Sequence, residues 1–292
     1  MQAARPTAPS DDELAARART GNQEAFAALY DRYFLGVFDL ALRVGRNRDT
    51  AADVVRRTFA TVWSELRARR PAESVKASSY TVARDCAIDE LRKKRRRGGR
   101  RPAEMHREGI DFTWIDASRS LETPELADKE LLEVVWDAAE ALSPEEYSLL
   151  DLHVRRGLEA TDLARHLGLS ATTVDARLAH LLDAFGDSAR TALLARRGRC
   201  DCAELEALVS WLGGDHVTAA VRRAVATHAR DCHQCQESKR RYVPPERILR
   251  SFALVPPTPG LHWQIWREVD PHAEDRAAPA RRARRWFSWQ RS

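Results

Sequence analysis

Apolar side chains recur at steps of three and four residues along most of the first hundred positions, and this period predicts helices. Phe26, Leu29, Tyr30 and Tyr33 form one such set. A second set follows: Val54, Val55, Phe59, Val62, Trp63 and Leu66. The alternation of apolar and polar residues that is typical of strands is absent. We therefore predict an all-α fold that begins with a helical domain at residues 12–97.

The helical period is lost after this domain. Gly98, Gly99 and Pro102 break the last helix, and helical spacing returns at about residue 124. We interpret residues 98–123 as a flexible linker and residues 124–197 as a second helical domain.

Residues 158–185 have the pattern of a helix-turn-helix. A short helix carries Leu163, Ala164 and Leu167, Gly168 allows a tight turn, and Ser170 can cap the next helix. The apolar positions of that second helix are Val174, Leu178 and Leu181. An ordinary helical hairpin is the alternative. If the second helix enters the major groove of DNA, four residues near its start are candidates for contact: Thr172, Thr173, Arg177 and His180.

Charge is unevenly distributed along the chain. The net charge is +5, but residues 92–101 hold eight basic residues and no acid, and residues 281–292 hold five. The first cluster ends an amphipathic helix predicted at residues 80–92. We assign three residues to the buried side of that helix: Val82, Cys86 and Leu91. Such clusters suit phosphate backbones or anionic surfaces. Residues 124–197 contain fourteen acids against eight Lys and Arg, so we expect weak DNA binding by the second domain alone.

Residues 227–235, THARDCHQC, gather a histidine and two cysteines. On a helix, His228 and Cys232 share one face, and Cys235 follows one turn later, where the helix can end. We find no secretory signal, so a reducing cytoplasm favours metal binding over disulfides. Structural zinc takes four ligands, and three residues could supply the fourth: Cys200, Cys202 or His216. Unligated residues in a helix pair are the alternative.

No motif typical of an enzyme is found. The chain has no glycine-rich phosphate loop, no nucleophile elbow and no HExxH sequence. Four protein ligands would leave zinc no open position for water. We therefore expect a structural or regulatory zinc and no catalytic residues. No run of 18 apolar residues is present, so we expect a cytoplasmic protein with no membrane span.

Three segments of the first domain resemble region 2 of the extracytoplasmic-function (ECF) sigma factors, a compact bacterial type of the sigma-70 family. They are FAALYDRY (26–33), ADVVRRTFATVW (52–63) and ARDCAIDELRKKRR (83–96). Residues 141–178 resemble region 4 of that family. The resemblance spans about residues 12–197. It implies that the protein binds core RNA polymerase, through the β′ clamp helices and the β flap, and recognises promoter DNA.

The resemblance also implies roles for individual residues. It assigns polymerase binding to Asp53, Arg56 and Arg57. It assigns promoter contacts in the first domain to Arg84, Asp89, Arg92, Lys93, Lys94 and Arg95. In the second domain, Thr173 and Arg177 would face the −35 promoter element, with Thr172 and His180 beside them.

Several residues depart from the family's usual pattern on surfaces that face polymerase and DNA. They are Ala52, Arg56, Arg57, Ser78, Ser79, Asp85 and Asp175, where the family usually has Glu, Gln, Glu, Trp, Leu, Asn and a basic residue. An alternative function is therefore a degenerate sigma-like module that regulates transcription through protein contacts without melting DNA.

Residues 202–235 resemble a zinc-containing anti-sigma domain, in which one cysteine precedes the His-x3-Cys-x2-Cys motif by twenty-five residues. This resemblance selects Cys202 as the fourth ligand, beside His228, Cys232 and Cys235. It predicts a zinc domain at residues 198–245 that contacts the sigma-like domains and regulates them in cis.

Residues 246–292 follow as a proline-rich and basic tail, in which we expect residues 270–292 to be disordered apart from the terminal Trp/Phe cluster. Within it, His262, Trp263 and Trp266 indicate an amphipathic segment that docks on the body of the protein or on a partner. Core packing is the simpler of the two uses.

Overall fold

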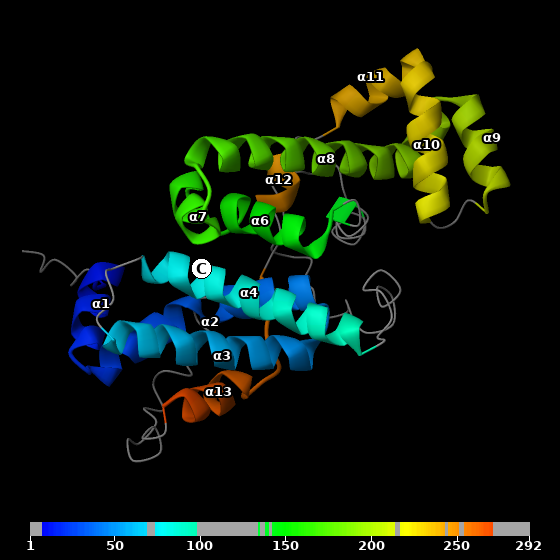
Figure 1. Ribbon diagram of the computed structural model, residues 1–292. Coiled ribbons are helices and arrows are strands. Elements are labelled where there is room, and N and C mark those ends of the chain that lie inside the picture. The colour runs from blue at the N-terminus through cyan, green and yellow to red at the C-terminus, as the bar shows by residue number, and fades with distance from the viewer. Residues whose placement is uncertain are drawn as a thin grey trace, which may run out of the picture. The chain divides into compact units, whose positions relative to one another are not determined.

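The computed structural model describes residues 8–68, 74–97, 134, 138–139, 142–213, 217–242, 245–250 and 254–270. Every regular element in these ranges is helical (Figure 1), which confirms the all-α prediction. The elements are α1 (Asp11–Arg19), α2 (Gln23–Gly45), α3 (Arg48–Arg67), α4 (Val75–Arg96), α6 (Pro144–Val154), α7 (Ala160–Leu167), α8 (Ala171–Arg197), η4 (Gly198–Cys200), α9 (Ala203–Trp211), α10 (Ala219–Asp231), α11 (His233–Arg241), α12 (Pro245–Arg250) and α13 (Leu261–Val269).

The chain divides into two compact units. The first comprises Met1–Gly98 and Val255–Ser292, and the second comprises Gly99–Leu254. The predicted linker at residues 98–123 lies outside the described residues, so its flexibility stays a prediction.

The first unit is built on α2, α3 and α4, which pack against one another. Each of these helices begins at a capping side chain, because Asn22, Asn47 and Ser74 accept hydrogen bonds from backbone N–H groups of the first turn. Tyr30 of α2 and Phe59 of α3 are fully buried, with ring centroids 4.6 Å apart. The apolar period of this part of the sequence therefore marks the core that joins the two helices.

Helix α4 buries a slightly different side from the one assigned to it above. Leu91 is buried as predicted, but Val82 and Cys86 are only half-buried. Ala83 and Ala87 are fully buried instead. Small residues face inward here because α4 packs against both α2 and α3, and close helix crossings exclude larger side chains.

Two helices lie wholly or largely in the segment predicted as a proline-rich and basic tail. Helix α12 packs on α6 and α8 in the second unit, and α13 packs on α3 in the first unit. The packing of α13 agrees with the amphipathic segment expected at His262, Trp263 and Trp266, whereas α12 was not predicted. Residues 271–292, including the terminal basic cluster, lie outside the described residues.

The second unit contains the predicted helix-turn-helix. Gly168 ends α7 in the left-handed region, with φ at 66°, where glycine has no steric cost. The Ser170 hydroxyl then accepts the Thr173 N–H at 3.1 Å and caps α8. Five of the six predicted apolar positions of this motif are buried, namely Leu163, Ala164, Val174, Leu178 and Leu181, and the sixth, Leu167, is half-buried.

A buried ion cluster lies at the end of α6, next to this motif. The Asp151 carboxylate is fully buried and binds Arg155 at 2.8 Å and Arg156 at 3.0 Å. Both arginine side chains are at most 4% exposed. Such a cluster is stable only while the opposite charges remain together.

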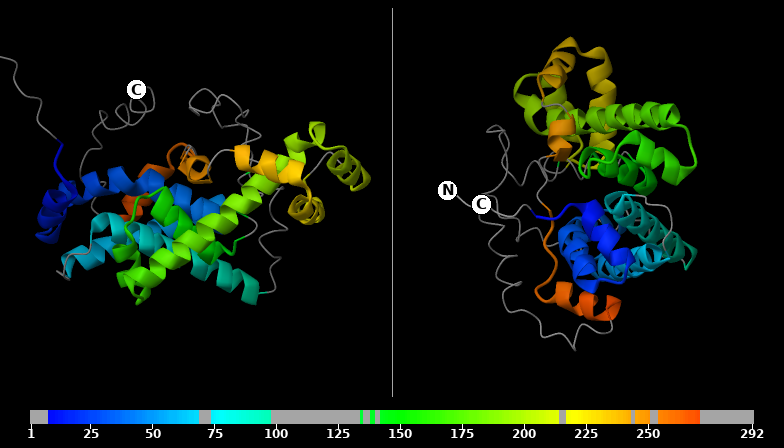
Figure 2. Two further views of the ribbon diagram at one scale, coloured as in Figure 1. Left: turned by 90° about the horizontal axis from the view of Figure 1, so that it is seen from above. Right: turned by 90° about the vertical axis from the view of Figure 1, so that its left-hand side faces the viewer.

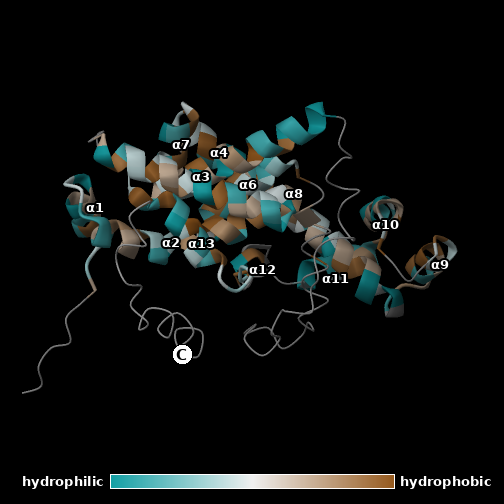
Figure 3. Cartoon of the chain, turned by 90° about the horizontal axis from the view of Figure 1, so that it is seen from below, coloured by the Kyte–Doolittle hydropathy of each residue, from teal (hydrophilic) through white to brown (hydrophobic). Residues whose placement is uncertain are grey.

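Helix α8 continues well past the helix-turn-helix, over 27 residues. Figure 2 shows α9, α10 and α11 gathered around its C-terminal end. Leu194 and Ala195 of α8 belong to the same buried cluster as Leu205, Val221 and Val225 of the helices that follow. Helices in this part of the chain carry both hydrophobic and hydrophilic positions (Figure 3), as amphipathic packing requires.

Replacing the cap of α6, Ser143→Ala, is expected to lower the free energy of unfolding of the second unit by about 1 kcal/mol. The Ser143 hydroxyl accepts the Glu146 N–H at 3.2 Å, and the Glu146 carboxylate accepts the Ser143 N–H at 2.9 Å. This backbone hydrogen bond lowers the pKa of Glu146. Urea denaturation measures the loss. Ser210→Ala, an exposed helical serine in the same unit, is the control, and an equal loss in both variants would contradict the capping role.

Candidate metal centre and nucleic-acid interface

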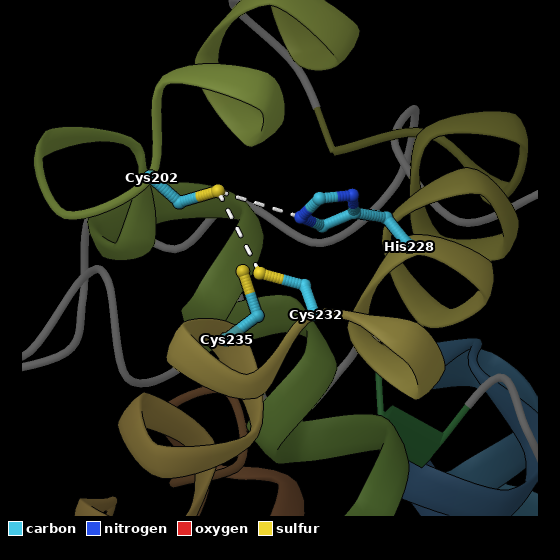
Figure 4. A group of neighbouring side chains, drawn as sticks. All are labelled: Cys202, His228, Cys232 and Cys235. Carbon is cyan, nitrogen blue, oxygen red and sulfur yellow. Dashed lines mark hydrogen bonds between the residues drawn. The ribbon is translucent and has the colours of Figure 1, made fainter.

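The four predicted metal ligands come from three different helices and meet at one point (Figure 4). Cys202 caps the N-terminus of α9, and His228 lies in the last turn of α10. Cys232 is the cap between α10 and α11, and Cys235 lies in α11. Their ligand atoms all lie within 4.8 Å of one another. The structure therefore forms a group of three sulfur atoms and one imidazole nitrogen that could hold a metal ion.

The distances within this group suit a tetrahedral zinc ion. Cys202 Sγ lies 3.4 Å from His228 Nε2 and 4.0 Å from Cys232 Sγ. A tetrahedral zinc ion would place a sulfur and a nitrogen ligand about 3.5 Å apart and two sulfurs about 3.8 Å apart. Thiolate and imidazole ligands also favour zinc over magnesium or calcium, which prefer oxygen. The residues present thus fit the ion that the sequence predicts.

A backbone N–H group lies at the sulfur of two of the cysteines. The Leu205 N–H donates to Cys202 Sγ at 3.5 Å, in the first turn of α9. The backbone N–H of Cys235 lies at the Cys232 sulfur and lowers the pKa of the Cys232 thiol. Burial has the opposite effect on Cys235 and raises the pKa of its thiol to about 12. A bound cation would compensate for the cost of charging this buried sulfur.

The local helix geometry differs from the simple continuous helix expected for His228 to Cys235. Helix α10 ends at Asp231, and Cys232 has extended backbone angles. Its N–H still donates to the His228 carbonyl oxygen at 3.1 Å. A new helix then begins at His233, so that Cys235 turns back toward Cys202.

The other two candidates for the fourth ligand fall on parts of the chain that the structure does not describe. His216 lies outside the described residues, as does the side chain of Cys200. Cys202 is 6% exposed and lies in the core of the domain, together with Cys235. The group also shares its core with Leu194 and Ala195 near the end of α8, and Lys239 of α11 binds Asp187 of α8 at 2.7 Å.

The DNA-contact candidates of the first unit lie along α4. Asp89, Arg92, Lys93 and Arg95 are exposed. Lys94 is half-buried and donates to the Thr50 hydroxyl at 2.7 Å, which ties it to α3. The last candidate, Arg84, is also half-buried and binds Asp85 at 2.9 Å. The exposed end of α4 is therefore strongly basic, as a surface for phosphates requires.

The candidates of the second unit lie on the first turns of α8. Thr172, Thr173, Arg177 and His180 are all exposed. The hydroxyl of Ser170 lies 2.9 Å from the Thr172 hydroxyl and 2.7 Å from that of Thr173. Asp175 is exposed on the same helix, and its carboxylate would repel phosphate.

The three polymerase-binding candidates lie on α3 and differ in their surroundings. Asp53 and Arg56 are exposed and bind each other at 3.0 Å. Arg57 is half-buried and binds Glu90 of α4 at 2.6 Å, so it serves packing between the helices. Arg56 has a second partner that sequence reasoning missed, Glu268 of α13, at 3.3 Å.

Residues 29–97 match the family model described as Sigma-70 region 2. This region 2 segment corresponds to most of α2, α3 and α4. The chain is also similar to the ECF RNA polymerase sigma factor BldN of Streptomyces coelicolor (strain ATCC BAA-471 / A3(2) / M145), with 30% identity over 178 residues. The aligned part is 56% of this chain and 61% of that protein. Both findings support the resemblance of the first part of the chain to sigma-70 factors of the ECF type.

The region 2 match ends at residue 97, so it does not bear on the metal ligands. The resemblance of residues 202–235 to an anti-sigma domain stays a prediction. Among the described helices, none combines the length and the apolar character needed to cross a membrane.

Proposed function

We propose that the protein is an RNA polymerase sigma factor that directs promoter-specific initiation of transcription. The region 2 match at residues 29–97 carries this proposal. Two further features support it: the basic exposed end of α4 and a helix-turn-helix whose second helix presents Thr173 and Arg177 to solvent. Region 2 would bind core polymerase and the −10 element, and α8 would read the −35 element.

The zinc domain is proposed to regulate this activity in cis. Helices α10 and α11 pack on α8, the helix that carries the DNA-contact candidates. Leu194 of α8 lies in the core that also contains Cys202 and Cys235. Binding or loss of a metal ion would therefore change the support of α8 directly. Zinc would supply folding free energy to a core too small to be stable by apolar burial alone.

Transcription in vitro tests the main proposal. Purified full-length protein is added to core RNA polymerase and pooled genomic promoter fragments from its own organism, and transcript start sites are mapped. A sigma factor gives discrete starts that core enzyme alone does not give. Truncation after residue 197 removes the zinc domain and α13 together. Comparing transcription by the truncated and full-length proteins therefore measures the combined regulatory effect of both parts.

A degenerate sigma-like module is the second candidate. Exposed Asp175 on α8 favours it, because a carboxylate at this position opposes phosphate binding. Ser78 and Ser79 on α4 stand where the sigma-factor resemblance implies Trp and Leu, and Ser79 is fully buried. This candidate predicts binding to core polymerase without promoter-specific transcripts in the same assay.

Neutralising the end of α4, with Arg92→Ala, Lys93→Ala and Arg95→Ala together, is expected to weaken promoter binding by the polymerase complex. The slope of log affinity against log salt concentration should fall by about 0.9 for each DNA phosphate that the variant no longer neutralises. Fluorescence anisotropy at several salt concentrations measures it. Arg17→Ala, at an exposed arginine on α1, is the control. An unchanged slope in the triple variant would show that the end of α4 does not contact DNA.

A further inference from the structure

Residues 255–270, which lead into α13 and include it, contact α2 and α3 at several separate points. We call these residues the strap. The Val255 N–H donates to the buried Asp39 carboxylate at 3.0 Å, and Arg48 donates to the Pro256 carbonyl oxygen at 3.2 Å. Farther along, the Tyr30 hydroxyl donates to the His262 carbonyl oxygen at 2.8 Å.

The apolar side of α13 covers aromatic residues of α2. The Trp266 ring lies 4.9 Å from that of Tyr30 and 5.8 Å from that of Phe26, centroid to centroid. Phe26 in turn stacks on Trp63 of α3 at 4.4 Å. Ile265 and Trp266 are 3% and 8% exposed, which confirms the packing expected for this amphipathic segment. Without α13, these rings of α2 and α3 would form an exposed aromatic surface, and such surfaces are typical of protein interfaces.

The polar edge of α13 meets one of the polymerase-binding candidates. Glu268 binds Arg56 at 3.3 Å, and Arg56 also binds Asp53 at 3.0 Å. The strap therefore occupies the side of α3 on which two of the three candidates lie.

We propose that the strap is an intramolecular occupant of a helix-docking surface on α2 and α3, and that it must leave this surface before core RNA polymerase can bind there. The inference rests on the proposed sigma-factor function. The external partner would be an amphipathic helix of polymerase with a large apolar side chain for the Phe26–Tyr30–Trp63 surface. It would also carry an acidic residue to replace Glu268 at Arg56.

The structure of the strap suits an occupant that can be displaced. Helix α13 has nine residues, and Gly260 at its N-cap supplies no side-chain hydrogen bond. Helices of this length are marginal in water without packing. The Arg56–Glu268 pair is about half exposed, at 44% and 58%, so it contributes little to holding the strap in place.

Hydrogen exchange of the full-length wild-type protein, with and without core polymerase, tests displacement. The amides of α13 should be protected in the free protein and lose protection in the complex, while those of α3 remain protected. If the protein binds polymerase and α13 keeps its protection, the strap is a permanent part of the unit and the inference is wrong. If the protein does not bind polymerase at all, the proposed function fails, and with it the inference.

Two variants of the strap give an independent measurement of affinity for core polymerase. Glu268→Arg replaces attraction to Arg56 by repulsion and should tighten binding by about two- to fivefold. Trp266→Ala should tighten it further, provided that circular dichroism shows a folded chain. Gln264→Ala, at an exposed position of α13, is the control. Equal affinity of wild type, Glu268→Arg and Gln264→Ala would contradict the inference even if Trp266→Ala does not fold.

Discussion

Replacing Cys235 with serine is expected to release the metal ion and unfold α9, α10 and α11, while α1 to α4 stay folded. The Cys235 side chain is 1% exposed and lies in a small core that is completed by two of the ligands themselves. Structural zinc sites contribute roughly 10–16 kcal/mol of apparent binding free energy, which far exceeds the stability of such a core. Zinc content by mass spectrometry and hydrogen exchange by segment measure the two effects together.

The matched control for this variant is Cys86→Ser. Cys86 is half-buried on α4 and is not one of the four grouped residues. It should keep one zinc ion per chain and normal protection of α9 to α11. If wild-type protein held no zinc, or if the Cys235→Ser variant kept its zinc and its helices, the group of four would not be a structural metal site.

Replacing Asp151 with alanine is expected to lower the free energy of unfolding of the second unit by roughly 3–5 kcal/mol. The substitution removes the carboxylate that the buried guanidinium groups of Arg155 and Arg156 share. Their desolvation is then poorly compensated, and the helix-turn-helix loses the end of α6 on which it packs. Urea denaturation followed by tryptophan fluorescence and hydrogen exchange of α6 to α8 measure the loss.

An exposed pair in the same unit is the comparison for this effect. Asp162→Ala removes the ion pair with Arg165, in which the arginine side chain is 57% exposed. Such pairs contribute about 0–1 kcal/mol. A similar small loss from Asp151→Ala would show that the buried cluster is not needed for the fold of α6 to α8.

The metal ligands could be found from the sequence because their signal is short-range. His228, Cys232 and Cys235 lie within eight positions, and helical geometry alone brings the first two to one face. Cys202 came from the resemblance to a zinc-containing family and not from geometry. The end of α10 at Asp231 could not be predicted, because a periodic pattern does not reveal where one helix stops and the next begins.

The helix-turn-helix could also be predicted from the sequence, since Gly168 and Ser170 supply the turn and the helix cap two positions apart. The strap could not. Its packing depends on residues more than two hundred positions away, such as Asp39 and Tyr30. Residue spacing can indicate an amphipathic segment, but only tertiary contacts decide which surface it covers.

The side-chain pairs of α3 also could not be predicted from the sequence. A resemblance can assign Arg57 to a polymerase interface, but it cannot show that this side chain binds Glu90 of α4. Nor can helical period place Ala83 and Ala87 inward in preference to Val82 and Cys86, because these positions are neighbours on the helical wheel. The close approach of α4 to both α2 and α3 decides which of these positions are buried.

The length of α8 connects two candidate sites within the second unit. At about 1.5 Å per residue, the 27 residues of α8 span about 40 Å. Thr172 and Thr173 lie in its first turn, and its other end lies in the core that contains Cys202. No loop interrupts α8, so one continuous helix connects the core of the metal group to the DNA-contact candidates. Under the functions proposed above, oxidation or loss of zinc at one end would therefore act on the same helix that carries Thr172 and Thr173 at the other end.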